Sequence, residues 1–461
     1  MGNHPFSLCE KKSHKCILLV AGVIKLRYNH CEKKSHEVTI MLKEMTIKNF
    51  KSINKEITFS MEADIERVSE YPQHIIDINN NKLLKVASMY GPNGGGKTNL
   101  LSALNLVKML VLSGGPFPIA SEASWSCSFN NDDVISMTLF FVTPKYEIGY
   151  SFDVLYKNER QEIMDFTGNK NALLFGKFEI NSEILVYKAI HDQEYNTLFE
   201  RDDKGHITSE RLDKITLQYA NTINNSLTAL LYFYNTFVNY KAIKDPELEV
   251  ILYLYNEIFN IYELEVNGNV NYDAAFKAKE KNKERLVSLL NDVDIKISDI
   301  IIQQEDKMNP IKFERTIMIN GKEEKKLLPL AYESKGTKKI FWMLLNLLNE
   351  KERSHIYYCD DMNAYLHPKL FKAIIEIFNS EENKMNQLIF NSHDIINMTN
   401  ELFRRDEIWF VYRDEDYSTR LTPLSNIVNY KGEQVRKDAK YFKQYLEGRY
   451  GADPFIKKIN L

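Results

Sequence analysis

Hydrophobic and polar residues alternate along much of the chain, which is the pattern of strands with one buried face. The alternation is clear at 44–50 ("EMTIKNF") and 55–61 ("KEITFSM"), and it returns through residues 136–200. Leu83–Tyr90 ("LLKVASMY") is a more continuous apolar run, typical of a central strand that is buried on both faces. A glycine-rich turn and the helical pattern "TNLLSALNLVKMLVLS" follow this run, so the sequence predicts an α/β fold.

The later part of the chain begins with a helical stretch and then returns to the α/β pattern. Residues 215–305 have mostly helical periodicity, alternation resumes near residue 311, and an amphipathic helix follows "YESKG". We therefore predict four parts. They are an N-terminal extension (1–40), the two halves of one α/β head (41–210 and 306–461), and a helical insert between the halves (211–305).

The composition excludes several classes of function. The net charge of −3 provides no global positive field, so nucleic acid could be bound only through a local basic patch. No apolar run reaches the roughly 18 residues of a membrane span, and "ILLVAGVI" is not followed by a signal-peptide cleavage site. The five cysteines are too few for a disulfide scaffold in 461 residues. We predict a cytoplasmic protein that does not act with a membrane.

The first 40 residues contain the hexapeptide "CEKKSH" twice, at 9–14 and 31–36, and three of the five cysteines. Zinc would use these residue types, but the spacing of Cys9 and Cys16 matches no common zinc finger. We expect a poorly ordered extension instead. A strand-like pattern begins afresh at Met41.

The octapeptide "GPNGGGKT" (91–98) fits the phosphate-loop pattern G-x-x-x-x-G-K-[ST] in full, and it lies between the predicted buried strand and the predicted helix. Glycines let backbone N–H groups turn towards phosphate oxygens, and the N-terminus of the following helix favours the same anion. In this pattern Lys97 reaches the β- and γ-phosphates, and the Thr98 hydroxyl ligates Mg²⁺. The sequence therefore predicts a site for a nucleotide and Mg²⁺.

Two adjacent carboxylates, Asp360 and Asp361, follow the apolar run "HIYYC" (355–359). We expect Asp360 to lie beside the Mg²⁺ ion and Asp361 to orient or deprotonate the attacking water. The simpler interpretation is a pair of acids that makes a strand end soluble. The phosphate loop favours the catalytic interpretation.

Two further residues could contact the nucleotide. Ser334 in "ESKGTKKI" is a predicted helix N-cap, close to Gly336, and would leave N–H donors facing outward. His393 ends the short strand in "QLIFNSHD" (387–394), where it could sense a γ-phosphate. Taken singly, Ser334 is only a cap and His393 only a loop histidine. With the phosphate loop and the two acids, they form a set.

In this order the motifs resemble those of the ABC-type ATPase superfamily, which includes SMC proteins, RecF and the OLD proteins. The resemblance is closest to the stand-alone bacterial AAA15-type ATPases of the RloA and abortive-infection kind, and it runs from Met41 almost to the C-terminus. The matching stretches are "IKNFKSI", "LLKVASMYGPNGGGKTNLLSAL", "ESKGTKKI", "DDMNAYLHPKL", "NSHD", "RRDEIWFVYRD" and "YLEGRYGADP".

The resemblance implies a P-loop head with a mixed central sheet flanked by helices, and with an antiparallel β subdomain. It also implies that two heads enclose two ATP molecules, so that ATP favours a homodimer or a higher homo-oligomer. Ser334 and Gly336 would contact the γ-phosphate held by the partner copy, and His393 would be the switch histidine. The nucleotide-binding residues would be Gly91, Pro92, Asn93, Gly94, Gly95, Gly96, Lys97, Thr98, Asn99, Ser334 and Gly336.

Departures from the family pattern narrow the function. The signature "ESKGT" in place of LSGGQ argues against a transporter motor, and the insert lacks the heptads of an SMC arm. Asp361 replaces the usual Glu, which removes roughly 1.5 Å of reach and can lower the rate on the order of a hundredfold. Asp414 and Asp416 could imitate the acids of a Toprim nuclease, but we interpret them as a hairpin turn. Any nuclease or toxin effector is therefore expected to be a separate protein.

Three hypotheses remain open. The first is an ATP-hydrolysing sensor or regulatory subunit of a bacterial anti-phage system, of the abortive-infection or restriction-linked kind, with a separate effector. The second is a RecF-like or SMC-like ATPase that acts in DNA repair or at DNA ends. The third is an ATP-gated scaffold that dimerises but hydrolyses ATP slowly or not at all because of Asp361.

Overall fold

The computed structural model describes residues 40–113, 134–164, 170–237, 246–264, 283–303, 311–349, 354–428 and 432–452. Thr39–Leu461 forms one unit, and Met1–Val38 is assigned to another. The N-terminal extension predicted for residues 1–40, with its alternative as a zinc site, lies outside the described residues except for Ile40.

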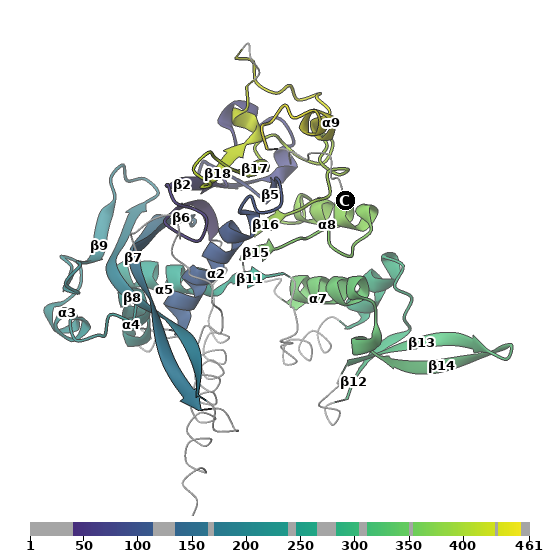
Figure 1. The fold of residues 1–461 in the computed structure, drawn as a ribbon, viewed down its shortest axis with the longest axis horizontal. Coiled ribbons are helices and arrows are strands. Elements are labelled where there is room, and N and C mark those ends of the chain that lie inside the picture. The colour runs from purple at the N-terminus through teal and green to yellow at the C-terminus, as the bar shows by residue number, and fades with distance from the viewer. Residues whose placement is uncertain are drawn as a thin grey trace, which may run out of the picture. The chain divides into compact units, whose positions relative to one another are not determined.

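A mixed sheet of six strands carries the phosphate loop, in the order β11-β15-β16-β5-β17-β18 (Figure 1). Its first five strands run parallel, and β18 pairs antiparallel with β17. Every residue of β5 and β15 is buried, as their continuous apolar runs predict for central parallel strands. The strands are β5 (Val86–Tyr90), β11 (Ile261–Glu263), β15 (His355–Cys359), β16 (Asn386–Asn391), β17 (Ile408–Arg413) and β18 (Thr419–Pro423).

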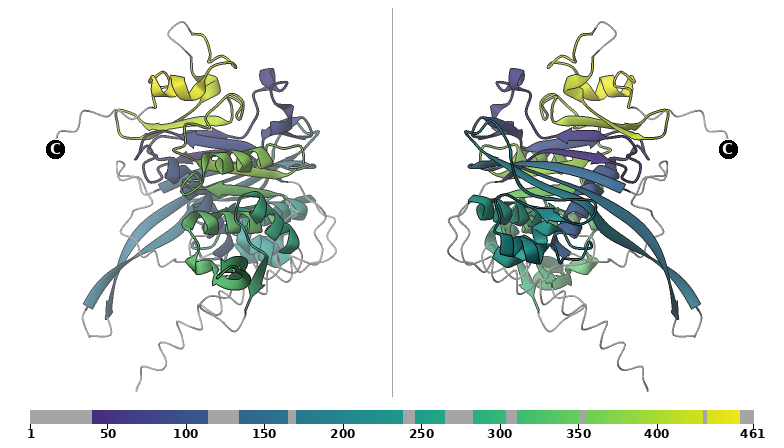
Figure 2. Two further views of the ribbon diagram at one scale, coloured as in Figure 1. Left: turned by 90° about the vertical axis from the view of Figure 1, so that its right-hand side faces the viewer. Right: turned by 90° about the vertical axis from the view of Figure 1, so that its left-hand side faces the viewer.

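An antiparallel sheet of seven strands, in the order β10-β9-β8-β7-β6-β1-β2, accounts for the alternating segments of the first half. Buried residues alternate with half-buried ones along most of β6, as expected where one face of a sheet packs on the core. β7 and β8 pair along a long hairpin that Figure 2 shows in blue. The strands are β1 (Met41–Lys48), β2 (Ile57–Ser60), β6 (Val134–Val142), β7 (Tyr146–Met164), β8 (Lys170–Ala189), β9 (Asn196–Arg201) and β10 (Ile207–Thr208).

Helices alternate with the strands of the mixed sheet. α2 (Lys97–Ser113) follows β5, α7 (Lys335–Asn349) precedes β15, and α8 (Pro368–Phe378) connects β15 to β16. The "LHP" motif begins α8, because the His367 side chain accepts a hydrogen bond from the Lys369 N–H and Pro368 occupies the first turn. The buried residues of α8 recur with helical spacing and join the core of the mixed sheet; they are Phe371, Ile374, Ile375 and Phe378.

The predicted helical insert contains α3 (Lys214–Ala220), α4 (Ala229–Phe237), α5 (Pro246–Phe259) and the helical residues 283–292. It also contains two strands that helical periodicity did not reveal. β11 pairs with β15 in the mixed sheet, and β12 (Asp299–Ile302) begins an antiparallel sheet with β13 (Ile311–Ile319) and β14 (Lys322–Pro329). The predicted α/β fold, with a mixed sheet, an antiparallel β region and helices, is confirmed.

The C-terminal part of the chain completes the mixed sheet. Asp414 and Asp416 lie in the turn between β17 and β18, where Asp414 Oδ1 accepts from the Asp416 and Ser418 N–H groups. This confirms the predicted hairpin turn. α9 (Tyr441–Leu446) buries Tyr441 and Tyr445 in the same core as β17. No helix in the described part of the chain is long and apolar enough to cross a membrane.

A buried glutamine joins the two large sheets. Gln387, at the start of β16, is fully buried, and its side-chain oxygen accepts from the Leu42 N–H of β1 at 2.8 Å. Its amide nitrogen donates to the Leu42 carbonyl at 2.9 Å. The mixed sheet and the antiparallel sheet are therefore held in a fixed relation at this point, because an unpaired amide here would be costly.

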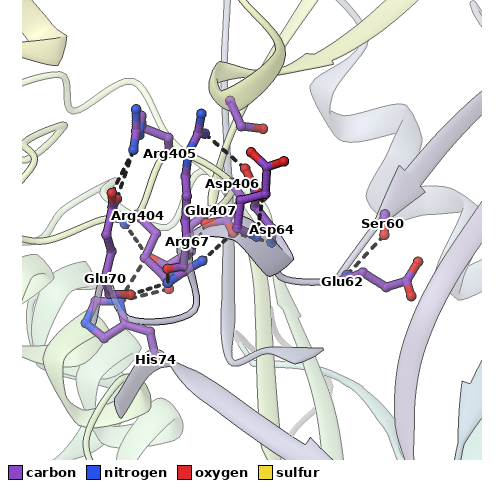
Figure 3. A network of polar contacts seen from close by, with 12 residues as sticks. Ser60, Glu62, Asp64, Arg67, Glu70, His74, Arg404, Arg405, Asp406 and Glu407 are labelled. Carbon is purple, nitrogen blue, oxygen red and sulfur yellow. Dashed lines mark hydrogen bonds and ion pairs between the residues drawn. The ribbon is translucent and has the colours of Figure 1, made fainter. Parts of the chain in front are cut away.

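A network of buried charges lies where β17 begins (Figure 3). Arg404 donates to both carboxylate oxygens of Asp406, at 2.8 and 2.6 Å. Glu407 accepts from the Arg404 N–H at 2.7 Å, and its carboxylate lies 3.0 Å from His74 Nδ1. Arg405 pairs with Glu70 at 2.9 Å. The network joins residues 64–74 to residues 404–407, which directly precede β17.

Candidate nucleotide site

Four parallel strands of the mixed sheet have their carboxyl ends on the same side of the sheet. Polar residues of the site lie at or directly after each of these ends. β5 leads into the phosphate loop, β15 into Asp360 and Asp361, and β16 into Ser392 and His393. The last residue of β17 is Arg413, whose Nε donates to the Gly94 carbonyl of the phosphate loop at 2.5 Å. Because these strands are parallel, residues that are far apart in sequence meet at their carboxyl ends.

The phosphate loop needs its glycines because β17 and β18 pack closely against it. Gly91 has a φ of 151°, and a Cβ at this position would lie 1.9 Å from the Val411 carbonyl oxygen. Gly96 has a φ of 108°, and a Cβ there would lie 2.1 Å from Thr419 Oγ1. Thr419 Oγ1 also donates to the Gly95 carbonyl at 2.9 Å. Substitution at either glycine would therefore displace the loop from the sheet.

Lys97 is the first residue of α2, and its side chain folds back into the loop. Its Nζ donates to the carbonyls of Gly91 at 2.9 Å and Pro92 at 3.1 Å. Burial lowers the pKa of Lys97 from its usual value, while the nearby charges of Asp361 and Asp360 act in the opposite direction. The ammonium is thus held inside the loop, next to both predicted acids.

Asp360 contacts Thr98 directly. The Thr98 hydroxyl donates to Asp360 Oδ1 at 3.0 Å, and Asn391 Nδ2 donates to the same oxygen. Hydroxyl and carboxylate oxygens are the hard ligands that Mg²⁺ prefers, so this pair fits the predicted cation. No cluster of three or more His, Cys, Asp or Glu side chains suited to a metal occurs among the described residues. A Mg²⁺ ion here would therefore take most of its ligands from phosphate and water, as is usual for it.

The backbone at Asp361 is left-handed, with a φ of 45°. Its N–H donates to Asn391 Oδ1 at 2.6 Å, and its carbonyl accepts from Lys339 Nζ at 3.0 Å and from the Ala364 N–H at 2.8 Å. Asp and Asn adopt this conformation more readily than most other non-glycine residues. This gives a local reason for Asp where the family pattern has Glu.

His393 and Asp361 face each other across the site. His393 Nε2 lies 3.8 Å from Asp361 Oδ1, and the two side chains are 46% and 57% exposed. Burial and the charge of Lys97 lower the pKa of His393, while Asp361 and Asp360 oppose that shift. Asn363 holds the segment because its side-chain oxygen accepts from the His393 N–H at 3.0 Å and from Ser392 Oγ at 2.9 Å. The imidazole is therefore mainly neutral at neutral pH and accessible to a ligand.

Ser334 caps α7, as the sequence predicts. Its Oγ accepts from the Thr337 N–H at 3.1 Å, and the residue is exposed. Gly336 lies against the Tyr365 carbonyl, where a Cβ would come within 2.4 Å of the oxygen. Between described residues, no hydrogen bond joins Ser334 to the phosphate loop of the same chain.

Sequence reasoning missed several residues of the site. Lys51 is half-buried, and its amine donates to Ser102 Oγ on α2 at 3.0 Å. Partial burial lowers the pKa of Lys51, while Asp360 opposes the shift. Asn391 and Lys339 were also missed. Asn391 hydrogen-bonds to the Asp360 side chain and the Asp361 N–H, and Lys339 donates to the Asp361 carbonyl. Asn99, predicted to bind nucleotide, donates its side-chain N–H to Ser52 Oγ at 2.6 Å. Lys51, Lys339 and Asn391 all lie in stretches that carry the resemblance, but no spacing within those stretches assigns a role to them.

Comparison with known proteins identifies one family and several similar structures. The family model described as "AAA domain, putative AbiEii toxin, Type IV TA system" matches residues 86–397. No protein with a curated description matches the chain.

Three solved structures of SMC heads are similar to this chain. The SMC head domain from Thermotoga maritima is 14% identical, with a TM-score of 0.37, and the match covers 83% of this chain and 98% of that one. An SmcHead bound to the C-winged helix domain of ScpA is 13% identical, with a TM-score of 0.38 and coverage of 83% and 97%. The Smc head with an extended coiled coil, bound to the C-terminal domain of ScpA from Pyrococcus furiosus, is 11% identical, with a TM-score of 0.39 and coverage of 84% and 96%.

Proposed function

Because the chain belongs to the family described as "AAA domain, putative AbiEii toxin, Type IV TA system", we propose that it binds and hydrolyses ATP as an ABC-type ATPase. This proposal rests on one observation. Lys97, the Thr98–Asp360 pair and Asp361 lie close together at the carboxyl ends of β5 and β15. A turn that is only rich in glycine would not also bring a lysine, a hydroxyl and two carboxylates together at the end of a buried strand.

The residues divide the work of hydrolysis among them. Backbone N–H groups of Gly94–Lys97 and the N-terminus of α2 bind the phosphates, and Lys97 exchanges its two carbonyl partners for phosphate oxygens. Thr98 and Asp360 would hold Mg²⁺, which supplies positive charge against the charge that develops on the phosphate oxygens. Asp361 orients the attacking water, and the neutral His393 imidazole donates its N–H to the γ-phosphate.

The same proposal includes a second copy of the chain. Ser334 is exposed at the N-terminus of α7 and has no hydrogen bond to the phosphate loop of its own chain among the described residues. A γ-phosphate held by a partner copy would satisfy the free N–H groups of that helix end. ATP would then favour the dimer, because only the dimer offers both halves of the site.

We further propose a role as the sensor or regulatory subunit of a bacterial anti-phage system with a separate nuclease or toxin effector. The family description, which names a putative toxin of a toxin–antitoxin system, supports this class of role. A DNA-repair or DNA-end ATPase is the second candidate. The third is a slow or non-hydrolysing scaffold, and the replacement of Glu by Asp361 favours it.

The test measures ATP binding, phosphate release with and without DNA, and mass in solution with and without ATP. We expect Ser334→Arg to block ATP-dependent dimerisation while the monomer still binds ATP. Thr208→Arg places the same side chain at an exposed position of the edge strand β10 and should leave dimerisation intact. Self-association of Ser334→Arg at the level of the unmodified chain would exclude the two-copy site.

Purification from the native host separates the three roles. A co-purifying nuclease or toxin favours the defence role. Turnover that rises with DNA in the absence of any partner favours the repair role. ATP binding and dimerisation with negligible phosphate release would leave the scaffold as the function.

A further inference from the structure

The first turns of α7 and the segment after β15 are joined at three points. Lys339 Nζ donates to the Asp361 carbonyl at 3.0 Å, and Lys335 Nζ donates to Tyr365 Oη at 3.2 Å. Gly336 lies so close to the Tyr365 carbonyl that only a residue without a Cβ fits there. The helix end that carries Ser334 and the loop that carries Asp361 are therefore physically coupled.

Among these contacts, the one made by Lys339 is the deepest. Lys339 is 3% exposed, although it lies only five residues after the exposed Ser334. A buried ammonium needs strong acceptors, because its desolvation is otherwise uncompensated. One acceptor of Lys339 is the Asp361 backbone carbonyl, so this bond acts on the conformation of the main chain.

Asp361 is the residue whose conformation this bond controls. Its peptide is held on one side by Asn391 and on the other by Lys339 and Ala364, in the left-handed region. Its side chain is 57% exposed and has few constraints of its own. The direction of the carboxylate therefore depends on how the backbone is held, and a small misplacement of a catalytic group lowers the rate strongly.

We propose that Lys339 is a positioning residue that couples Asp361 to the Ser334 end of α7, so that contact of a second copy with Ser334 sets the orientation of the Asp361 carboxylate. The proposal rests on the proposed function and deepens it. Ser334 and Lys339 are separated by little more than one turn of a rigid helix, so a displacement at the cap reaches the Lys339 amine. Hydrolysis in one site of a dimer would then depend on ATP in the other site.

The chain supplies a matched control in the neighbouring lysine. Lys338 Nζ donates to the Ala331 carbonyl at 3.1 Å and makes no hydrogen bond to Asp361 in the described residues. Lys338→Met and Lys339→Met remove the same charge from adjacent positions of one helix. Met also keeps the aliphatic stem, and only Lys339→Met removes a bond to the Asp361 carbonyl.

The experiment measures the ATP Kd, kcat, KM, the Hill coefficient and amide hydrogen exchange of the peptide that contains residues 361–366. For Lys339→Met we expect kcat to fall about tenfold or more, Kd and KM to stay within about twofold, and the Hill coefficient to approach one. Exchange in this peptide should rise about tenfold, because the carbonyl anchor is lost. Lys338→Met should resemble the unmodified chain in all five, and Lys339→Arg should recover part of kcat.

Parallel losses of kcat and ATP affinity, or equal losses in the two methionine variants, would overturn the proposal, because they indicate a general structural role. A chain that binds ATP without releasing phosphate would contradict the proposed hydrolysis instead. In that case hydrogen exchange still decides, since unchanged exchange at 361–366 in Lys339→Met excludes the coupling. Should Lys339→Met fail to fold, Lys339→Gln is measured against the same criteria.

Discussion

Ionisable side chains gather at the amino ends and at the carboxyl ends of the strands of the mixed sheet. The two groups of side chains differ in burial and in pairing. Just before β17, Arg404, Asp406, Glu407 and His74 are at most 7% exposed, and each lies within 3.0 Å of an ionisable partner (Figure 3). At the carboxyl ends of the strands, Asp361 and His393 are about half exposed, and Asp361 Oδ1 lies 3.8 Å from His393 Nε2.

The difference indicates which group holds the fold and which is available to a ligand. Buried charges that satisfy one another have no capacity left for a substrate, and losing one partner leaves the other uncompensated. The pKa values of His393 and Lys97 are both lowered, and neighbouring groups with perturbed pKa values are typical of functional sites. We therefore expect substitutions at the amino ends of the strands to lower the free energy of unfolding. Substitutions at the carboxyl ends should impair ATP binding or hydrolysis instead.

The largest effect is expected for Lys97→Ala. This change removes the amine that donates to the Gly91 and Pro92 carbonyls inside the phosphate loop and that would bind the phosphates, so detectable ATP binding should disappear. The free energy of unfolding without ATP should change by less than about 1 kcal/mol, since burial already disfavours the charged amine. Calorimetric titration and denaturant unfolding measure the two quantities. Lys48→Ala, at the exposed end of β1, is the control, and ATP affinity within tenfold of the unmodified chain would contradict the prediction.

Arg404→Met should have the opposite profile. It leaves the buried Asp406 carboxylate without its two guanidinium bonds, and breaking such a pair costs about 3–5 kcal/mol of unfolding free energy. At a temperature where the variant remains folded, its ATP Kd should stay within about twofold. If denaturant unfolding shows that Arg404→Met lowers the free energy of unfolding by less than about 1 kcal/mol, the network contributes little to stability. Arg436→Met, which loses an exposed pair with Asp438, is the matched control.

Two substitutions of Asp361 refine the comparison within the site. Asp361→Asn keeps a residue that tolerates the left-handed backbone but removes the charge, so kcat should fall about a hundredfold with ATP binding retained. Asp361→Glu should also lower kcat, by about tenfold, because the fixed peptide is shaped for the shorter side chain. Steady-state phosphate release measures both. An increase of kcat in Asp361→Glu would mean that the shorter acid makes the native enzyme slow.

How far the sequence predicts this molecule depends on the distance over which each feature is encoded. The phosphate loop, the Ser334 cap, the strand that precedes Asp360 and the turn at Asp414 are local patterns, and the structure contains each of them. β11 was missed because three residues carry too little periodicity, and its partner β15 lies far along the chain. The hydrogen bonds from Asp361 to Asn391 and from Lys339 to Asp361 were missed for the same reason. They exist only after β15, β16 and α7 have packed together.

A smaller effect on stability than that of Arg404→Met is expected for Lys85, a buried residue that directly precedes β5. Its Nζ donates to the Ser380 carbonyl at 2.7 Å, and burial lowers its pKa to about 8, while Glu381 and Glu407 oppose the shift. Between pH 8 and 10.5 the unfolded chain holds this proton and the folded chain has released it, so the free energy of unfolding rises with pH in this window. Lys85→Met lacks the proton in both states. We therefore expect the stability of the unmodified chain relative to Lys85→Met to increase by on the order of 2 kcal/mol from pH 8 to 10.5. Denaturant unfolding at several pH values measures the difference, with Lys48→Met as the exposed control. A difference that is independent of pH would mean that the Lys85 amine stays charged in the folded protein and would contradict the prediction.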